Sequence, residues 1–166
     1  ERPKSISLTF ALKHDAFALS SSSPFPARHK DNALSASGYC RQLGNISLPC
    51  FVPLDADLHA AGLCASFAED EQGTIWTYLP YGPFDTLAEY TDYVRAITAT
   101  GDVFFFAIQD NATGRFVGVA SYLRINPTAG SIEVGHLCFA PALQATIGAT
   151  EAMFLMMQWA FEAGYR

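Results

Sequence analysis

The stretch 144–149 is the part of the sequence best suited to bind an anion. It joins a β-like run over 137–139, which stops near Pro141, to a helical pattern that opens at Ala149 or Thr150. The stretch holds no lysine or arginine, so its hydrogen-bond donors are backbone N–H groups. Successive N–H groups at the start of a helix can hold a phosphate. The alternative is an ordinary turn in which small residues only allow close packing.

Three alternating apolar runs precede this stretch and must set its place in the fold. They cover about 103–109, 115–125 and 131–139, and the two short connections between them contain Gly. Alternating runs joined by tight turns predict an antiparallel meander. A helical pattern over 149–163 follows the third run. The sequence therefore predicts an α/β fold with a mostly antiparallel sheet and helices on both faces.

The segment before the meander predicts one more strand and two helices. The run 47–54 has the composition of a strand, and Asp55 can cap a helix over 56–69. Asp85 can cap a second helix in the same way. Between the two helices lies 73–84, a loop with two prolines and four aromatic residues. The expected order from residue 47 is β-α-α-β-β-β-α.

The N-terminal quarter of the chain differs from the rest. The stretch 18–38 is rich in Ser, Pro and Ala and has no hydrophobic period, which is typical of a linker. A short strand is expected over 5–12. We expect residues 1–46 to be a flexible segment and residues 47–166 to form the folded domain.

The composition of the chain excludes several classes of function. A net charge of −6 and a pI near 5.0 argue against nucleic acid as a main partner, because phosphate binding needs a basic face. No apolar run reaches the ~18 to 20 residues of a membrane span. Cys40, Cys50, Cys64 and Cys138 form no C-x-x-C pair, so reduced thiols in a cytoplasmic protein are expected. Cysteines and histidines are too scattered for zinc, and we expect no metal site.

Two motifs of the chain resemble those of the GNAT superfamily of acetyl-CoA-dependent N-acetyltransferases. One is D-x-x-T-G-x-x-V-G-x-x-S over 110–121, and the other is I-E-x-G-x-x-x-x-x-P-x-x-Q-x-x-x-x-A-T-E-A-M over 132–153. The aromatic stretch 76–84 matches as well. The similarity covers about 48–166 and is closest to the branch of the ribosomal-protein N-terminal alanine acetyltransferases. It implies transfer of an acetyl group to a primary amine.

The resemblance also implies a coenzyme A site at the start of the last helix. The family's phosphate loop reads [QR]-x-x-G-x-[GA], and here Ile147 replaces its central Gly. The loop would hold the diphosphate, and the end of the preceding strand would bind the pantetheine arm through its main chain. The implied cofactor-binding residues are Phe139, Ala140, Gln144, Ala145, Thr146, Ile147, Gly148, Ala149 and Thr150.

Catalytic and substrate-binding candidates follow from the same resemblance. Glu133 matches the strand position of a glutamate that is the general base in several family members, although it could be a polar residue facing solvent. His136 is the second candidate, and its odd spacing from Glu133 puts it on the opposite sheet face unless a bulge intervenes. Trp76, Tyr78 and Tyr81 lie where the family shapes its acceptor pocket, or they form the loop's own core.

The family fold continues beyond the last helix with strands that complete the pantetheine groove and carry a tyrosine general acid. The sequence ends at Arg166 without them. We therefore expect a fragment, or a truncated domain in which residues 1–45 supply a substitute strand or activity is lost. A non-catalytic binding module is the alternative function. The expected partners are acetyl-CoA, an unknown amine and, because open sheet edges favour association, a second copy in a homodimer.

Overall fold

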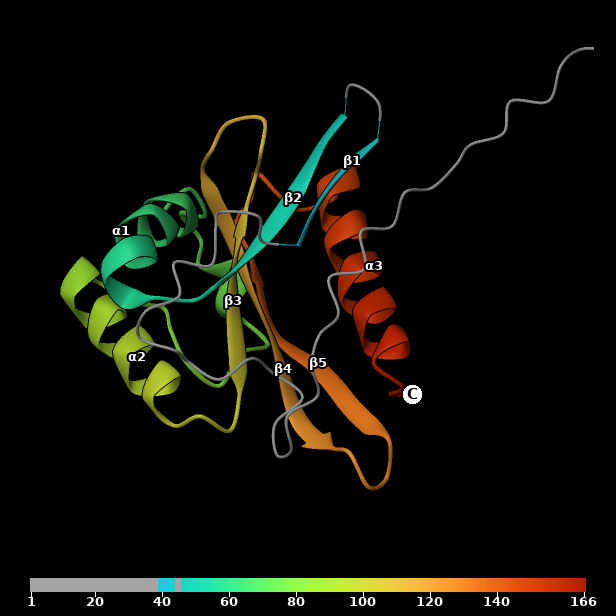
Figure 1. The fold of residues 1–166 in the computed structure, drawn as a ribbon. Helices are drawn as coiled ribbons and strands as arrows, with labels where there is room; N and C mark the ends of the chain where they lie inside the picture. Colours follow the sequence, from blue (N-terminus) through green and yellow to red (C-terminus); the bar gives the residue numbers. More distant parts are fainter. Residues whose placement is uncertain (1–38, 44–45) are drawn as a thin grey trace, which may run out of the picture. The chain divides into compact units, whose positions relative to one another are not determined.

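The computed structural model describes residues 39–43 and 46–166, which fold as a sheet with helices on its two faces (Figure 1). The strands are β1 (Tyr39–Leu43), β2 (Ile46–Pro53), β3 (Phe104–Gln109), β4 (Phe116–Asn126) and β5 (Ser131–Phe139). The helices are α1 (Ala56–Phe67), the short 3-10 helix η1 (Thr74–Trp76), α2 (Leu87–Ala99) and α3 (Ile147–Glu162).

The described strands form a sheet in the order β1-β2-β3-β4-β5, and every neighbouring pair is antiparallel. Figure 1 shows α1 and α2 on one face of this sheet and α3 on the other. Gly114 and Gly130, which end the two meander turns, have φ values of 72° and 65°, a region that glycine enters without strain. The predicted α/β class, the meander and the element order are confirmed.

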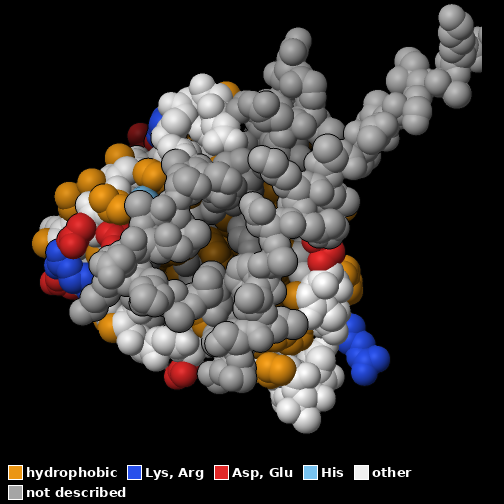
Figure 2. All heavy atoms as spheres, viewed as in Figure 1, with side chains coloured by type: hydrophobic (Ala, Val, Ile, Leu, Met, Phe, Trp, Pro, Cys, Tyr) orange, Lys and Arg blue, Asp and Glu red, His pale blue; other side chains and the backbone are white. Residues whose placement is uncertain are grey.

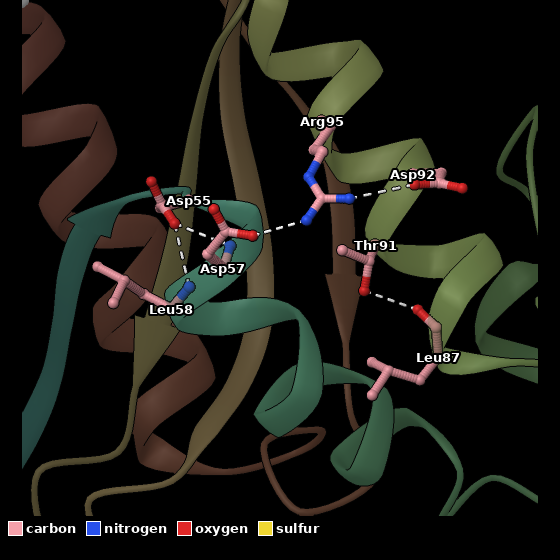
Figure 3. Close-up of polar contacts among 7 residues, drawn as sticks. All are labelled: Asp55, Asp57, Leu58, Leu87, Thr91, Asp92 and Arg95. Carbon is pink, nitrogen blue, oxygen red and sulfur yellow. Dashed lines mark hydrogen bonds and ion pairs between the residues drawn. The ribbon is translucent and has the colours of Figure 1, made fainter.

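The main core lies between the sheet and the pair α1–α2. Leu63 of α1 and Val94 of α2 are fully buried against Ala107 of β3 and its neighbours. At the surface, Arg95 of α2 binds Asp57 of α1 at 2.7 Å (Figure 3). Because both side chains are more than half exposed to solvent, this ion pair contributes little to stability. Apolar burial therefore holds the two helices to the sheet.

On the other face, Tyr122 of β4 anchors α3. Its hydroxyl donates to the carbonyl oxygen of Met156 at 2.7 Å, and its ring lies 5.0 Å from that of Trp159 and 5.8 Å from that of Phe106. Tyrosine combines a large apolar ring with a hydroxyl that needs a partner when buried. This contact fixes the position of the helix whose first turn is the candidate anion site.

The structure departs from the sequence prediction at several element boundaries. Residues 39–43, expected to be part of the flexible segment, form β1 against β2. The N-cap of α2 is Thr86 and not Asp85. Helix α3 begins at Ile147, two residues earlier than expected. The expected strand over 5–12 and the linker over 18–38 lie outside the described residues.

The cysteines also depart from expectation. Cys50 is disulfide-bonded, and it stands opposite Cys40 in the β1–β2 register. Cys64 and Cys138 are free. The prediction of reduced thiols is therefore wrong for Cys50. Because disulfides persist mainly in oxidising compartments, the cysteines no longer support a cytoplasmic location.

The surface of the described domain mixes charges of both signs. In the view of Figure 2, acidic and basic side chains lie beside one another over α1 and α2. Among the described residues, no helix is long and apolar enough to cross a membrane. No group of three or more potential metal ligands comes together in that part of the chain either.

Candidate active site

The connection from β5 to α3 is folded by its own hydrogen bonds. The Ala140 N–H donates to the Val117 carbonyl at 2.9 Å, and the Ala140 carbonyl accepts from the N–H groups of Leu143 and Gln144. The Gln144 side-chain amide donates to the Phe139 carbonyl at 2.8 Å. The polar groups of Ala140 and the carbonyl of Phe139 are thus engaged within the chain, against the expectation that they are available to a pantetheine arm.

The first turn of α3 is capped by Thr146. Its hydroxyl accepts from the Ala149 N–H at 3.1 Å and donates to the Leu143 carbonyl at 2.6 Å. The Thr150 N–H donates to the Thr146 carbonyl. Ala149 and Thr150 were both expected to bind the cofactor. Their N–H groups instead donate to the capping hydroxyl and to a carbonyl of the helix.

Four consecutive N–H groups are left over at this turn. They have no hydrogen-bond partner within the described part of the chain, and we call them the four free amides. They lie at the N-terminal end of α3, where the helix dipole adds partial positive charge. The four free amides belong to Ala145, Thr146, Ile147 and Gly148.

The backbone around the four free amides explains why Ile147 is tolerated there. Its side chain is 70% exposed, and the positive φ in this turn, 56°, is at Ala145. No glycine is needed at 147 for either space or conformation. At Gly148 a Cβ would meet Leu143 Cδ1 at 3.3 Å and Thr146 Oγ1 at 3.4 Å, so glycine lets the turn close tightly.

A bulge in β5 brings the two candidate catalytic side chains to one face. Gly135 pairs with Ser121 and Cys138 pairs with Val119, so one extra residue lies between them on β5. The φ of His136, 50°, marks this bulge. An extra residue breaks the strict alternation of faces. His136 thereby joins Glu133 on the side of the sheet covered by α1 and α2.

Glu133 is held by a neighbour on β4. Its Oε2 atom lies 2.7 Å from Nη1 of Arg124, and its side chain is 45% exposed. Leu123 is its register partner, and a Cβ at Gly135 would lie 3.7 Å from Glu133 Oε1. The carboxylate is therefore partly accessible to solvent, and its Oε1 atom lies over Gly135 beside the Leu123 side chain.

His136 is surrounded by aromatic rings. Its Nδ1 atom lies 3.2 Å from the hydroxyl oxygen of Tyr81, whose ring stacks on the imidazole at 5.7 Å. The ring of Phe105 lies 5.1 Å away. Burial lowers the pKa of His136, and the nearby Glu133 partly opposes this effect. The imidazole is therefore neutral near pH 7.

The aromatic loop between α1 and α2 is divided between core and surface. Trp76 packs on Phe67 at 5.3 Å, and the cavity beside it is only ≈ 10 Å³, room for about one water. Tyr78 is 96% exposed. Tyr81 is the one of the three predicted substrate-binding residues that touches a candidate catalytic side chain. Trp76 instead agrees with the alternative interpretation, in which the aromatic residues form the loop's own core.

Two residues that the sequence analysis did not single out belong to this site. Arg124 is the ion-pair partner of Glu133, and the ring of Tyr93 of α2 packs on that of Tyr81, with their centroids 4.7 Å apart. Tyr93 follows Tyr90 by three residues and so lies on the sheet-facing side of α2. This i, i+3 spacing is the feature of the sequence that could have identified Tyr93. Burial raises the pKa of the Cys138 thiol to about 12, so this cysteine is not a nucleophile at neutral pH.

The comparisons with known proteins agree with this geometry. The sequence model of the acetyltransferase (GNAT) domain matches residues 50–165. A GCN5-related N-acetyltransferase from Brucella melitensis is 33% identical with a TM-score of 0.69, and the match covers 75% of this chain and 56% of that one. A GNAT-family protein from Chromobacterium violaceum ATCC 12472 is 32% identical with a TM-score of 0.67, covering 89% and 71%. The search of curated proteins found no significant match.

A more distant structure shows the fold alone. The GNAT-family acetyltransferase from Bacillus anthracis is 15% identical with a TM-score of 0.54, over 71% of this chain and 65% of that one.

The chain spans little more than half of the length of the Brucella protein. The family match extends over most of the chain and includes the bulge, the four free amides and α3. The chain therefore belongs to the GNAT acetyltransferase family.

Proposed function

We propose that the chain is the donor-binding part of an N-acetyltransferase that uses acetyl-CoA. The observation that carries this proposal is the set of four free amides at the positive end of α3. A diphosphate needs several hydrogen-bond donors and a positive potential, and a helix start supplies both without a lysine. The residues of this turn therefore fit coenzyme A.

The second part of the proposal concerns the acceptor amine. Acetyl-CoA supplies the acetyl group as a thioester, whose C–S bond breaks as the new C–N bond forms. The amine must lose a proton to react, and Glu133 is the proposed base. Its carboxylate is accessible and lies on the face that also carries His136. In this scheme the departing thiolate takes a proton from solvent.

The acceptor is proposed to enter beside the aromatic loop. Tyr81 is half-buried next to His136, and Tyr78 is exposed on the same loop. Trp76 attaches the loop to α1 by packing on Phe67. The sequence resemblance to the alanine acetyltransferase branch supports the N-terminal amine of a peptide as the first acceptor class.

An acetyl-transfer assay on the full-length gene product tests this function. The acceptors are a peptide with an N-terminal alanine, a polyamine and an amino sugar, each incubated with acetyl-CoA. We expect release of free thiol together with a product heavier by one acetyl group for one acceptor class. Thiol release without an acetylated product, or neither with any acceptor, would contradict the proposal.

A non-catalytic binding module is the second candidate. It is favoured by apolar side chains exposed on α3, namely Met157 at 46% and Phe161 at 65%. Such a surface suits association with another protein, including a second copy of this chain. Light scattering tests self-association: a mass of twice the monomer that falls on substitution of Phe161 by Glu supports the homodimer, and a monomer at all concentrations rejects it.

A further inference from the structure

The outer side of α3 carries a line of exposed apolar residues. Five of the exposed residues of this helix follow one another at steps of three and four residues, which places them in one row along the helix. Four of the five are apolar, and none is charged. We call this row the α3 stripe, and its residues are Ile147, Thr150, Phe154, Met157 and Phe161.

The composition of the α3 stripe is unusual for the solvent side of a helix. A helix that packs one side on a sheet ordinarily carries charged and polar residues on the other side. Helix α2 follows this rule, because Glu89, Asp92 and Arg95 are exposed on it. In α3, Glu162 of the last turn is the one exposed residue with a charge. The exposed fractions of its side chains give the stripe about 400 Å² of apolar surface, the size of a patch that often binds another molecule.

The direction of the α3 stripe favours a separate molecule as its occupant. Ala152, Met156 and Ala160 are the buried residues of α3, and Met156 accepts the hydrogen bond from Tyr122 of β4. At about 100° per residue, the stripe lies on the side of the helix opposite to these residues. A further helix on the same face of the sheet would lie beside α3 and contact its flanks (Figure 1). Such a helix would leave the outer side of α3 uncovered.

The spacing of the α3 stripe matches the seam of a two-helix coiled coil. Steps of three and four residues are positions a and d of a heptad, whose side chains fit between those of a facing helix with the same spacing. A second copy of this chain supplies such a helix. Two stripes together bury about 800 Å², which is small for a specific interface. We therefore expect a dimer that dissociates on dilution.

The charges of α3 favour an antiparallel pair of helices. Glu162 is exposed in the last turn, where its Oε1 atom accepts a hydrogen bond from Nε2 of Gln158 at 2.7 Å. In an antiparallel pair centred on Phe154, this carboxylate lies toward the first turn of the partner helix. The four free amides and the helix dipole favour negative charge there. A parallel pair would instead bring the positive ends of two helices together.

We propose that the α3 stripe is the interface of a homodimer in which the α3 helices of two copies pack antiparallel. This inference gives a surface and a geometry to the homodimer named above as the second candidate, and it does not depend on acetyl transfer. The net charge of −6 disfavours the other apolar occupant, an anionic lipid surface. Phe154 lies at the centre of the pair, where a replacement has the largest effect on association.

Sedimentation of the full-length protein without acetyl-CoA measures this association directly. We expect a monomer–dimer equilibrium, and Phe154→Glu should raise its dissociation constant about tenfold or more, because the charge enters the centre of the interface from both copies. Leu58→Glu on α1 is the matched control, since Leu58 is 74% exposed and lies outside the stripe, and the equilibrium should not change. A monomer at every concentration, with or without phosphatidylcholine vesicles, would overturn the proposal, and so would equal effects of the two substitutions.

Cysteine cross-linking tests the antiparallel arrangement. In such a pair Thr150 of one copy lies beside Met157 of the other. A mixture of Thr150→Cys and Met157→Cys proteins should therefore form covalent dimers on oxidation, and Thr150→Cys alone should not. Cross-linking of Thr150→Cys to itself would overturn the arrangement, because it requires parallel helices. The wild-type protein, oxidised in the same way, controls for Cys64 and Cys138. Neither experiment uses an acetyl donor, so both remain decisive if the protein acetylates no amine.

Discussion

Arg124 and Glu133 face each other across β4 and β5, with Nη1 of the guanidinium 2.7 Å from Oε2 of the carboxylate. The Oε1 atom lies over Gly135, 3.7 Å from the place of a Cβ there, and the Leu123 side chain lies beside the same place. One carboxylate oxygen is thus held in an ion pair, while the side chain as a whole stays 45% exposed to solvent. This arrangement suits a carboxylate that accepts a proton from an incoming amine.

Replacing Glu133 tests this role in catalysis. Glu133→Gln keeps the size of the side chain and removes its basicity, so we expect kcat to fall by ~10²-fold or more with unchanged affinity for coenzyme A. Arg124→Gln is the matched control, because it removes the ion pair and leaves the carboxylate; we expect less than a tenfold loss. Steady-state kinetics on both variants give the comparison, and unchanged turnover in Glu133→Gln would return this residue to a surface role.

The aromatic loop depends on glycine at position 82. Its φ is 77°, and a Cβ there would lie 2.6 Å from the Trp76 ring. Gly101 has a similar φ of 76° but nothing within 4 Å of the added atom. Gly101→Ala should therefore cost about 1 kcal/mol of unfolding free energy, and Gly82→Ala should cost about 2 kcal/mol more because of the clash. Urea unfolding measures both free energies. Equal losses in the two variants would show that the loop shifts to make room for the added methyl group.

Stability should fall as the pH drops below about 6.5, the usual pKa of histidine. Burial lowers the pKa of His59, with Asp55 opposing in part, and burial lowers that of His136 as well. The unfolded chain then binds protons that the folded chain rejects, so stability is full above pH 6.5 and is lost on acidification. His59→Asn should reduce this loss in urea unfolding at pH 5.0 compared with pH 7.5. An equal loss in the variant would contradict the assignment.

The disulfide of Cys50 predicts the number of reactive thiols. The sequence contains four cysteines, and among those whose side chains the structure describes Cys50 is disulfide-bonded and Cys64 and Cys138 are free. Thiol titration of the unfolded, unreduced protein should therefore find two thiols, and four after reduction. Four thiols without reduction would show that the bond does not form in the isolated protein.

The sequence was sufficient for the fold because its local signals agree with the tertiary structure. Alternating runs that end at Gly114 and Gly130 leave few options other than a meander, and the structure places tight turns at both. Strand β1 was missed because its residues have no alternating pattern and its pairing with β2 depends on contacts away from its own sequence. The capping residue Thr86 was missed in favour of Asp85, its neighbour, since both types cap helices well.

The site was only partly predictable for a different reason. A glycine at the position with positive φ would have indicated the bulge of β5. That position is occupied by His136, a residue for which this conformation is rare. The sequence could not say which amides of the loop remain free either. That depends on the carbonyl of Val117 and the hydroxyl of Thr146, which accept hydrogen bonds from the N–H groups of Ala140 and Ala149 respectively.

The most direct test of the coenzyme A site removes one of the four free amides. Ile147 is the first residue of α3, where proline is well tolerated, and Thr146 before it is extended, with φ −104° and ψ 165°, as proline requires. Ile147→Pro deletes the N–H, and Ile147→Ala keeps it. Calorimetry with coenzyme A should show affinity reduced about tenfold or more in Ile147→Pro, because a hydrogen bond to a charged group contributes about 1.5 to 3 kcal/mol. Ile147→Ala should bind like the wild type, and equal affinities in the two variants would contradict the account.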